Sequence, residues 1–562
     1  MKHSIILLLV FAGFMTQATA GIIMSPDTTD SENIGVQMAQ ARLKYQNNDY
    51  QGALRKYQEL HEIAPDDIML NYRTGETHFQ LKNYQEAIPY LEKCVDTEEA
   101  EKLKKLHYYL GRSHQKCFHF TDAINHFEIY INNLSGRDAK KDPATTYLAH
   151  AKNAKELMDK KADVEIKNMG EAINSKYVDA VPSITADKSV LVFTSRRPDK
   201  ADDLRDPNTG NYYDDVYISK KQEDGSWSEA KPIPGQINTD DYDANTSISP
   251  DGEIIYLYKN IQGETQSGDI YYSEKQSDGS WGKPKPLNEN KPEGFFDKIK
   301  NSFNILLKGE TAINSSYFET SASVTADKNT IYFVSEREKN NYGNADIWVA
   351  HKIGKGWSIP RNLGNNINTV DDEISVFIHP DGNTLFYASN GKHSMGGYDI
   401  LMSKKENGRW SEPVNLGYPV NTPYDEFHFT LSADSKTAYI SSNREGGLGQ
   451  VDIYKVDMSE YFDEMDLEFA GPRLTIVKGS IIDKDQNPIS TEITISDADS
   501  GETVTRLTSD EDGKYFITLK AGHTYRFEIN AEGMEPVKKE IKLPAGEDME
   551  SEKSWHFILS PR

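Results

Sequence analysis

Cysteine and basic residues are both scarce in this sequence. Its 562 residues include two cysteines, and 63 Lys and Arg stand against 88 Asp and Glu, which leaves a formal net charge of −25. A chain this acidic repels phosphate backbones and anionic lipid surfaces, so we expect it to bind neither nucleic acid nor a membrane surface. Beyond the N-terminus no apolar run approaches the roughly 18 residues that a membrane-spanning helix needs, so we expect no membrane span.

Motifs of catalysis and metal binding are missing as well. The nucleophile elbow G-x-S-x-G, the S-x-D-x-G-x-x-W motif of sialidases and a phosphate-binding glycine loop do not occur. His393 and Ser394 lie in a Gly-rich stretch, with no catalytic base that spacing identifies. We therefore predict no catalytic residues, no metal ligands, no bound cofactor and no enzymatic activity. Four histidines on predicted helices have the spacing of packing or surface residues rather than of metal ligands: His107, His114, His119 and His126.

The first twenty residues have the pattern of a signal peptide. Lys2 and His3 precede an apolar run from Ile5 to Phe14, and Ala18-Thr19-Ala20 is a small-x-small cleavage site. We predict cleavage before Gly21 and a flexible leader over residues 21–33. An uncleaved anchor is the alternative, although the run is short for a bilayer. No cysteine follows the run, which disfavours a lipoprotein.

A helical pattern repeats over residues 34–161. Small residues recur at one position, alanines at a second and bulky residues at a third, and this resembles the tetratricopeptide repeat. We predict an α-solenoid of about three repeats that ends with a polar helix near residues 143–161; a generic array of helical hairpins is the alternative. Cys94 and Cys117 would lie near opposite ends of antiparallel helices, so we predict no disulfide. The repeated positions are Ala41, Gly75 and Gly111; Ala53, Ala87 and Ala123; and Tyr57, Leu91 and Phe127.

A β-rich unit recurs five times within residues 162–458. Each copy has an Asp-containing turn, a β-rich run, a Gly-rich loop and a second run that begins near an aspartate; four copies also have a hairpin tryptophan. A repeat of roughly 40 to 50 residues with four strands is typical of a β-propeller blade. The corresponding residues are the turn aspartates Asp187, Asp251, Asp327, Asp381 and Asp434; the second-run aspartates Asp215, Asp269, Asp346, Asp399 and Asp452; and Trp227, Trp281, Trp357 and Trp410.

The ends of this region predict how the ring closes. The fifth copy lacks the final strand of the others, whereas residues 163–175 before the first copy match that strand. We therefore expect the N-terminal strand to complete the last blade, which removes the open edges. Five blades are favoured; six remain open if a degenerate copy lies in the insert, residues 288–313. In that insert Phe295, Phe296, Ile299, Phe303, Leu306 and Leu307 recur at helical spacing, which predicts a helix that caps the propeller or contacts a partner.

Residues 459–473 form an acidic linker, and alternating strands follow over residues 474–562. Seven short strands separated by turn residues predict a small β-sandwich. The overall prediction is a multidomain fold with an α-solenoid, a β-propeller and a β-sandwich.

The recurring aspartates allow two interpretations. Calcium prefers six to eight oxygen ligands, but equivalent aspartates spread around a ring do not converge on one ion. Asp-containing turns and strand starts use carboxylates to bind backbone amides, so a structural role is favoured. The turn at Asp510-Glu511-Asp512-Gly513 is interpreted in the same way, with a peripheral calcium ion as the alternative.

With the repeats and strand patterns described above, the chain resembles exported Gram-negative envelope proteins that combine tetratricopeptide repeats, a TolB-like β-propeller and a carboxypeptidase-regulatory-like domain. The propeller resemblance rests on SISPDGEIIYLYKN and IHPDGNTLFYASN, and that of the sandwich on VKGSIIDKDQNPISTEITISD. Relatives include an accessory component of type IX secretion and usually continue into an OmpA-like, peptidoglycan-binding domain, which this sequence does not contain.

The resemblance implies a non-enzymatic periplasmic scaffold, accessory to an outer-membrane or secretion complex. Envelope proteins would bind the solenoid groove and a propeller face, and a partner would supply any outer-membrane association; peptidoglycan binding is not expected. The alternatives are a glycan-binding or hydrolytic propeller, with an acidic or aromatic cleft, and a secreted structural protein.

Overall fold

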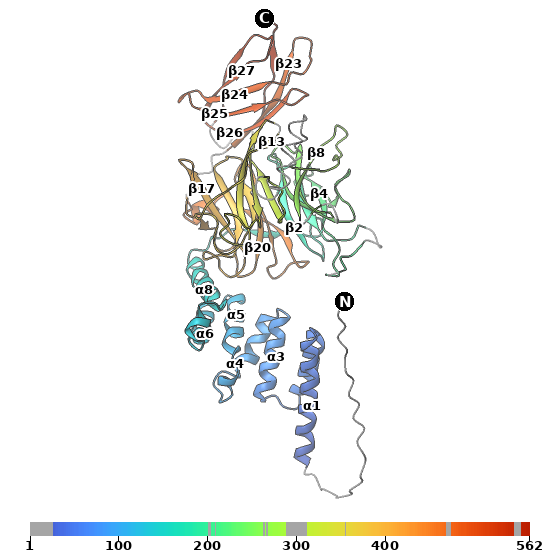
Figure 1. Ribbon diagram of the computed structural model, residues 1–562, viewed down its shortest axis with the longest axis vertical. Helices are drawn as coiled ribbons and strands as arrows, with labels where there is room; N and C mark the ends of the chain where they lie inside the picture. The colour runs from blue at the N-terminus through green and yellow to red at the C-terminus, as the bar shows by residue number, and fades with distance from the viewer. Residues whose placement is uncertain are drawn as a thin grey trace, which may run out of the picture. The chain divides into compact units, whose positions relative to one another are not determined.

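The computed structural model describes residues 26–199, 204–207, 209–261, 265, 268–287, 312–354, 356–467, 474–544 and 552–562. The predicted signal peptide and the predicted insert helix lie outside these residues. The chain divides into two compact units, Met1–Cys117 and Phe118–Arg562. A helical region is followed by many antiparallel β-sheets, as predicted (Figure 1). No described helix is both long enough and apolar enough to cross a membrane.

The first unit is built from consecutive helix pairs. Helix α1 packs on α2, α3 on α4, and α5 on both α3 and α4. The small and bulky residues of the predicted repeat are all buried. At Gly75 an added Cβ would lie 2.6 Å from Cγ of Leu91, so only glycine allows α3 and α4 to approach this closely. The elements are α1(Pro26–Gln46), α2(Tyr50–His61), α3(Ile68–Gln80), α4(Tyr84–Glu92), η1(Ala100–Lys102) and α5(Leu106–Lys116).

Two features of this unit bear on the predictions. Helix α1 begins at Pro26, so residues 26–33, predicted as part of a flexible leader, are helical. Proline suits the first turn of a helix, where no amide hydrogen is needed. Cys94 and Cys117 are not joined by a disulfide, as predicted.

The second unit begins with helices that were predicted to belong to the solenoid. They are α6(Phe120–Asn132), α7(Gly136–Ala139) and α8(Ala144–Met158), and α8 packs on α6. Nε2 of His150 on α8 lies 3.0 Å from the carbonyl oxygen of Gly391, and the Asn153 amide donates a 2.6 Å hydrogen bond to the carbonyl of Lys392. These contacts attach α8 to the β-rich region, so the boundary between the units falls within the predicted solenoid.

Five antiparallel sheets, numbered one to five in chain order, occupy the described part of residues 166–457. Their first strands are β2(Asp179–Ile184), β6(Tyr242–Ile248), β10(Glu319–Val324), β15(Glu373–Ile378) and β20(Glu426–Leu431). Each first strand contacts two other first strands. They follow one another in the order β2, β6, β10, β15 and β20, and β20 contacts β2, so the five strands form a closed ring. The outer strands are β3(Val190–Ser195), β4(Asp215–Lys220) and β5(Lys231–Pro232) in sheet one; β7(Ile254–Asn260), β8(Asp269–Glu274) and β9(Lys285–Pro286) in sheet two; β11(Thr330–Ser335), β12(Asp346–Ile353), β13(Gly356–Trp357) and β14(Arg361–Asn362) in sheet three; β16(Thr384–Ser389), β17(Asp399–Glu406), β18(Arg409–Trp410) and β19(Val414–Asn415) in sheet four; and β21(Thr437–Ser442) and β22(Asp452–Asp457) in sheet five.

Sheet five is completed by strand β1(Ile166–Asn168), which comes before sheet one in the chain. It pairs antiparallel to β22, with Ile166 opposite Val456. This is the pairing predicted from the match between residues 163–175 and the final strands of the other copies.

Hydrophobic side chains fill the spaces between adjacent sheets. The hairpin tryptophans belong to these layers: Trp410 of sheet four lies edge-on to Tyr332 of sheet three, and Trp227 of sheet one contacts Tyr439 of sheet five. Each of these tryptophans therefore packs against the preceding sheet, which explains its recurrence.

The predicted linker is partly ordered. Residues 461–464 form helix α10(Tyr461–Glu464), and the fully buried Tyr461 donates a 2.6 Å hydrogen bond to the carbonyl of Leu416. The predicted acidic linker therefore contains an ordered segment, because two adjacent aromatic residues bury their rings against sheets four and five. Residues 468–473 lie outside the described part of the chain.

Two sheets form the C-terminal sandwich, as predicted. One contains β23(Leu474–Asp483), β26(Lys514–Lys520), β29(Glu552–Ser554) and β30(Phe557–Leu559). The other contains β24(Glu492–Asp497), β25(Thr503–Thr508), β27(Thr524–Ile529) and β28(Val537–Lys542). The last predicted strand, residues 555–560, contains β30, and β29 is a further strand just before it; both pair parallel to β23.

Candidate functional site

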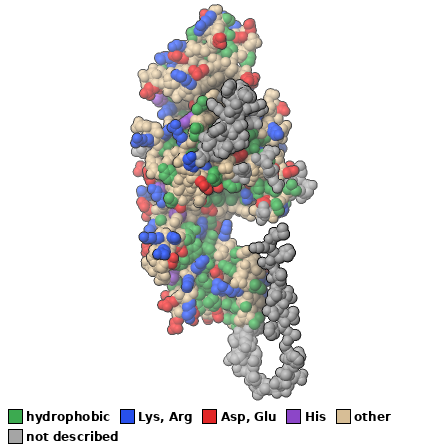
Figure 2. Space-filling view, viewed as in Figure 1, with side chains coloured by type: hydrophobic (Ala, Val, Ile, Leu, Met, Phe, Trp, Pro, Cys, Tyr) green, Lys and Arg blue, Asp and Glu red, His purple; other side chains and the backbone are tan. Residues whose placement is uncertain are grey.

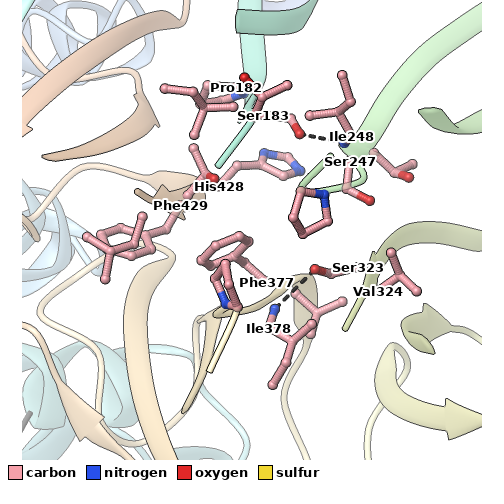
Figure 3. A pocket seen from close by; sticks show the side chains of 18 of the residues that line it. Pro182, Ser183, Ser247, Ile248, Ser323, Val324, Phe377, Ile378, His428 and Phe429 are labelled. Carbon is pink, nitrogen blue, oxygen red and sulfur yellow. Dashed lines mark hydrogen bonds between the residues drawn. The ribbon is translucent and has the colours of Figure 1, made fainter. Parts of the chain in front are cut away.

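A central pocket lies where the five first strands meet (Figure 3). Its volume is about 630 Å³, the open ends included. Figure 3 shows the rings of Phe377 and His428 pointing into the space between the strands. Serine, threonine, proline and aliphatic residues form most of the lining, which contains no Asp, Glu, Lys, Arg or Cys.

The pocket serines hold the ring together. Ser183 accepts a 2.6 Å hydrogen bond from the amide of Ile248 on the next first strand, and Ser323 accepts one of 3.1 Å from Ile378 (Figure 3). These bonds join neighbouring sheets where their first strands are too splayed to form a ladder. The serines are therefore structural rather than activated nucleophiles.

His428 is the titratable side chain of this pocket. Burial lowers its pKa to about 4, so the imidazole is neutral at pH 7, and its Nδ1 has no hydrogen-bond partner. A catalytic histidine is oriented by an acidic neighbour, and the pocket lining supplies none. The arrangement can bind a ligand through a neutral imidazole and hydroxyl groups, but it contains no acid–base pair.

The sandwich covers part of one end of the pocket. Ile476 of β23 and Phe516 of β26 pack against Ala186 and Ala433, which belong to the pocket lining. The Thr518 hydroxyl donates a 2.9 Å hydrogen bond to the carbonyl of Pro380, another lining residue. Entry from this end is therefore restricted.

The turn aspartates bind their own turns. Asp187, for example, accepts hydrogen bonds from the hydroxyl of Thr185 and from the amide and hydroxyl of Ser189. Asp251, Asp327, Asp381 and Asp434 make the same kind of bonds to residues within three positions. This is the structural role favoured from sequence, and no group of three metal-binding side chains exists among the described residues.

Three of the second-run aspartates hold the Gly-rich loops. Asp346 accepts hydrogen bonds from the amides of Tyr342 and Gly343 and from the side chain of Asn362. Asp399 and Asp452 bind loop amides in the same way, with Asn415 and Asn168 in the place of Asn362. The Ser394 hydroxyl donates to the carbonyl of Gly397 at 2.5 Å, so it belongs to this loop structure. Burial, reinforced by the charge of Glu319, raises the pKa of Asp269 to about 6.

A further set of acids escaped the sequence analysis. One carboxylate lies at the first or second position of each first strand, is fully buried, and accepts hydrogen bonds from the amide and hydroxyl of a Ser or Thr four residues earlier. The signal was present as a recurring Ser/Thr-x-x-x-Asp/Glu, which the mixture of Asp and Glu obscured. We call these the strand-opening acids: Asp179, Asp243, Glu319, Glu373 and Glu426.

Four strand-opening acids are neutralised by a basic side chain of the same sheet. Arg197 pairs with Asp179 at 2.5 Å, Arg337 with Glu319 at 3.3 Å, Arg444 with Glu426 at 3.0 Å, and Lys259 pairs with Asp243. In the described part of the chain no Lys or Arg forms an ion pair with the fifth acid, which lies in sheet four.

Comparison with known proteins identifies the C-terminal domain. Residues 476–552 match the model of the carboxypeptidase regulatory-like domain, as predicted. No curated protein matches the chain by sequence.

Similarity to solved structures is distant. A 3-chlorocatechol 1,2-dioxygenase from Rhodococcus opacus is 14% identical over 16% of this chain and 60% of its own, with a TM-score of 0.14. A Parabacteroides distasonis protein, provisionally described as a glycoside hydrolase, is 10% identical; the match covers 51% of this chain and 88% of that protein, with a TM-score of 0.31. A Trypanosoma rangeli sialidase is 9% identical; the match covers 67% of this chain and 89% of the sialidase, with a TM-score of 0.30. These values carry no inference about activity.

Proposed function

We infer that this protein is a non-enzymatic scaffold of the Gram-negative cell envelope. Its parts would be a tetratricopeptide solenoid, a five-bladed TolB-like propeller closed by β1, and the carboxypeptidase regulatory-like sandwich. The signal-peptide pattern of residues 1–20 supports export to the periplasm. Outer-membrane association would come through a partner, in an assembly such as a secretion complex.

The observation that carries this proposal is the chemistry of the central pocket. Glycoside hydrolysis uses a pair of carboxylates that flank a cleft, whereas the lining of this pocket contains none and its serines serve as links between sheets. The five turn aspartates and three of the second-run aspartates are likewise engaged in turns and loops. Binding rather than hydrolysis is the role that this arrangement favours.

The surface also suits protein recognition. Figure 2 shows acidic and basic side chains interspersed on the visible face, with hydrophobic side chains between them on the helical part. Stacked helix pairs present extended surfaces to peptides and helices, and all of the chain's predicted architectures are used elsewhere for recognition.

Cross-linking of the full-length protein in native envelopes, followed by purification and mass spectrometry, tests this function. A stoichiometric outer-membrane or secretion partner is expected. A soluble periplasmic monomer without partners would contradict the scaffold role, and a screen of glycans would then test the alternative of a carbohydrate-binding propeller.

A further inference from the structure

Sheet four lacks the basic residue that its neighbours possess. In sheets three and five an arginine follows the strand-opening acid by eighteen residues: Arg337 after Glu319 and Arg444 after Glu426. The corresponding residue after Glu373 is Gly391. Its amide donates to Ser389 Oγ at 3.2 Å, just as the Arg444 amide donates to Ser442 Oγ at 3.1 Å, so the backbone follows the same course and only the side chain is missing.

The arginines of the other sheets define what fits at this position. Nε of Arg337 donates to Ser335, and its two terminal nitrogens donate to the carbonyls of Ala312 and Ile313 at 3.2 and 2.7 Å. The guanidinium also lies 4.9 Å from the ring centre of Trp348. Arg444 repeats this pattern with Ser442, Pro419, Val420 and Tyr454.

In sheet four a pocket takes the place of the guanidinium. The space within its walls, open solvent included, is about 270 Å³. The walls include Asn366, Tyr387, Ser389 and Leu401, which are the counterparts of the arginine contacts, and also Lys392 and His393, both of which lie within salt-bridge distance of Glu412. The Tyr387 side chain is 1% exposed, and its hydroxyl has no hydrogen-bond partner. Glu412 lies at the exposed mouth.

Glu373 lies behind this pocket. Its Oε1 accepts hydrogen bonds from Ser389 at 2.8 Å and from Thr369 at 2.9 Å, and both of these residues line the pocket. Burial raises the pKa of Glu373 to about 7, an effect that Asp346 reinforces and that the hydrogen bonds from Thr369 and Ser389 oppose. A buried carboxylate without a counter-ion favours the binding of a cation.

We propose that the pocket of sheet four binds a guanidinium group from outside the chain, seated against Ser389, Tyr387 and Glu373 as arginines are seated in sheets one, three and five. The ligand is an arginine side chain of a partner or a small guanidinium compound. Simultaneous donation by two terminal nitrogens to backbone carbonyls and to the carboxylate distinguishes this cation from an ammonium group.

Calorimetric titration of the full-length protein tests the site. The probes are agmatine, a tripeptide with a central arginine, and the matching lysine tripeptide. Saturation by about 10 mM is expected for at least one guanidinium probe, since a group this small contributes limited affinity. Binding of agmatine would indicate a small compound, and binding of the arginine tripeptide alone would indicate a partner's side chain. Equal affinity for the lysine tripeptide, or binding of none, would overturn the proposal.

Three variants locate the binding. Gly391→Arg should abolish it by filling the pocket; an added Cβ there lies 3.1 Å from Thr369 Oγ1 and 3.3 Å from Ser389 Oγ, so these two hydroxyl groups must shift by a few tenths of an ångström. Glu373→Gln should weaken it about tenfold through loss of the charge-assisted contact. Arg444→Gly should create a second guanidinium site in sheet five. Because loss of Arg444 is expected to destabilise the fold, binding to this variant is measured as a rise in melting temperature on addition of agmatine. Unchanged binding by Gly391→Arg would refute the site.

Discussion

The side-chain amide of Asn168 donates a 2.7 Å hydrogen bond to the carboxylate of Asp452, across 284 residues of the chain. Asn168 ends β1, which completes sheet five before sheet one begins. Asn174 extends the connection, because its side chain bonds both the amide and the carbonyl of Ile453. The ring of five sheets is thus closed by segments from its two ends.

Removal of this contact should loosen the closure. We expect Asn168→Ala to lower the free energy of unfolding by about 1–2 kcal/mol, since Asp452 loses a buried partner, as measured by urea denaturation. Asn362→Ala is the matched control, because Asn362 makes the same bond to Asp346 within sheet three. Hydrogen exchange at the Ile453 amide should accelerate in the first variant alone; equal protection in both variants would contradict the closure role.

Arg444 should be essential for stability. The Arg444→Met variant leaves Glu426 fully buried without its counter-ion, and loss of one partner of such a pair costs about 3–5 kcal/mol. Arg526→Met provides the comparison, since Arg526 pairs with Glu540 at the surface and should contribute less than about 1 kcal/mol. Thermal and urea unfolding measure the stability of both variants. A similar decrease in the free energy of unfolding for the two would show that burial of the ion pair is unimportant.

Stability should depend on pH through Glu373. Its pKa of about 7 in the folded protein exceeds its ordinary value of 4.5, so the folded state retains a proton that the unfolded state releases. The stabilising contribution is complete below about pH 4.5 and is lost as the pH rises through 7, a change of about 3 kcal/mol.

The difference in unfolding free energy between wild type and Glu373→Gln, measured from pH 5 to pH 8, isolates this group from other titrating residues. Wild type should lose stability relative to the variant as the pH rises. Gly391→Arg should remove the loss by keeping the carboxylate ionised, and a constant difference across this range would exclude the raised pKa.

The sandwich should detach from the ring when one side chain is changed. Along β23 the side chain of Val477 enters the sandwich core, whereas that of Ile476 packs on Ala186 and Ala433. We expect Ile476→Asp to leave the sandwich folded but to speed proteolysis between the two parts, because a charge cannot be buried in that contact. Ile558→Asp, at a position that is 58% exposed, is the control and should change nothing.

Much of the architecture could be predicted because its signals are local. The turn aspartates bind residues a few positions away, strand alternation reflects one buried face, and Gly75 and Ala87 occupy packing positions set by the helical period. The match between residues 163–175 and the final strands of the other copies even predicted how the ring closes. The fifth copy lacks its final strand, and the sequence of that strand is recognisable before the first copy.

Other features depend on contacts between distant segments, which a single pass along the chain does not reveal. The attachment of α8 to Gly391 and of Tyr461 to Leu416 moved the predicted domain and linker boundaries. The importance of Gly391 appears only when five sheets bring equivalent positions into the same geometry, because an absent side chain leaves no motif. The sequence by itself determined the repeats and their local turns, whereas tertiary packing decided which strand-opening acids pair with a basic side chain.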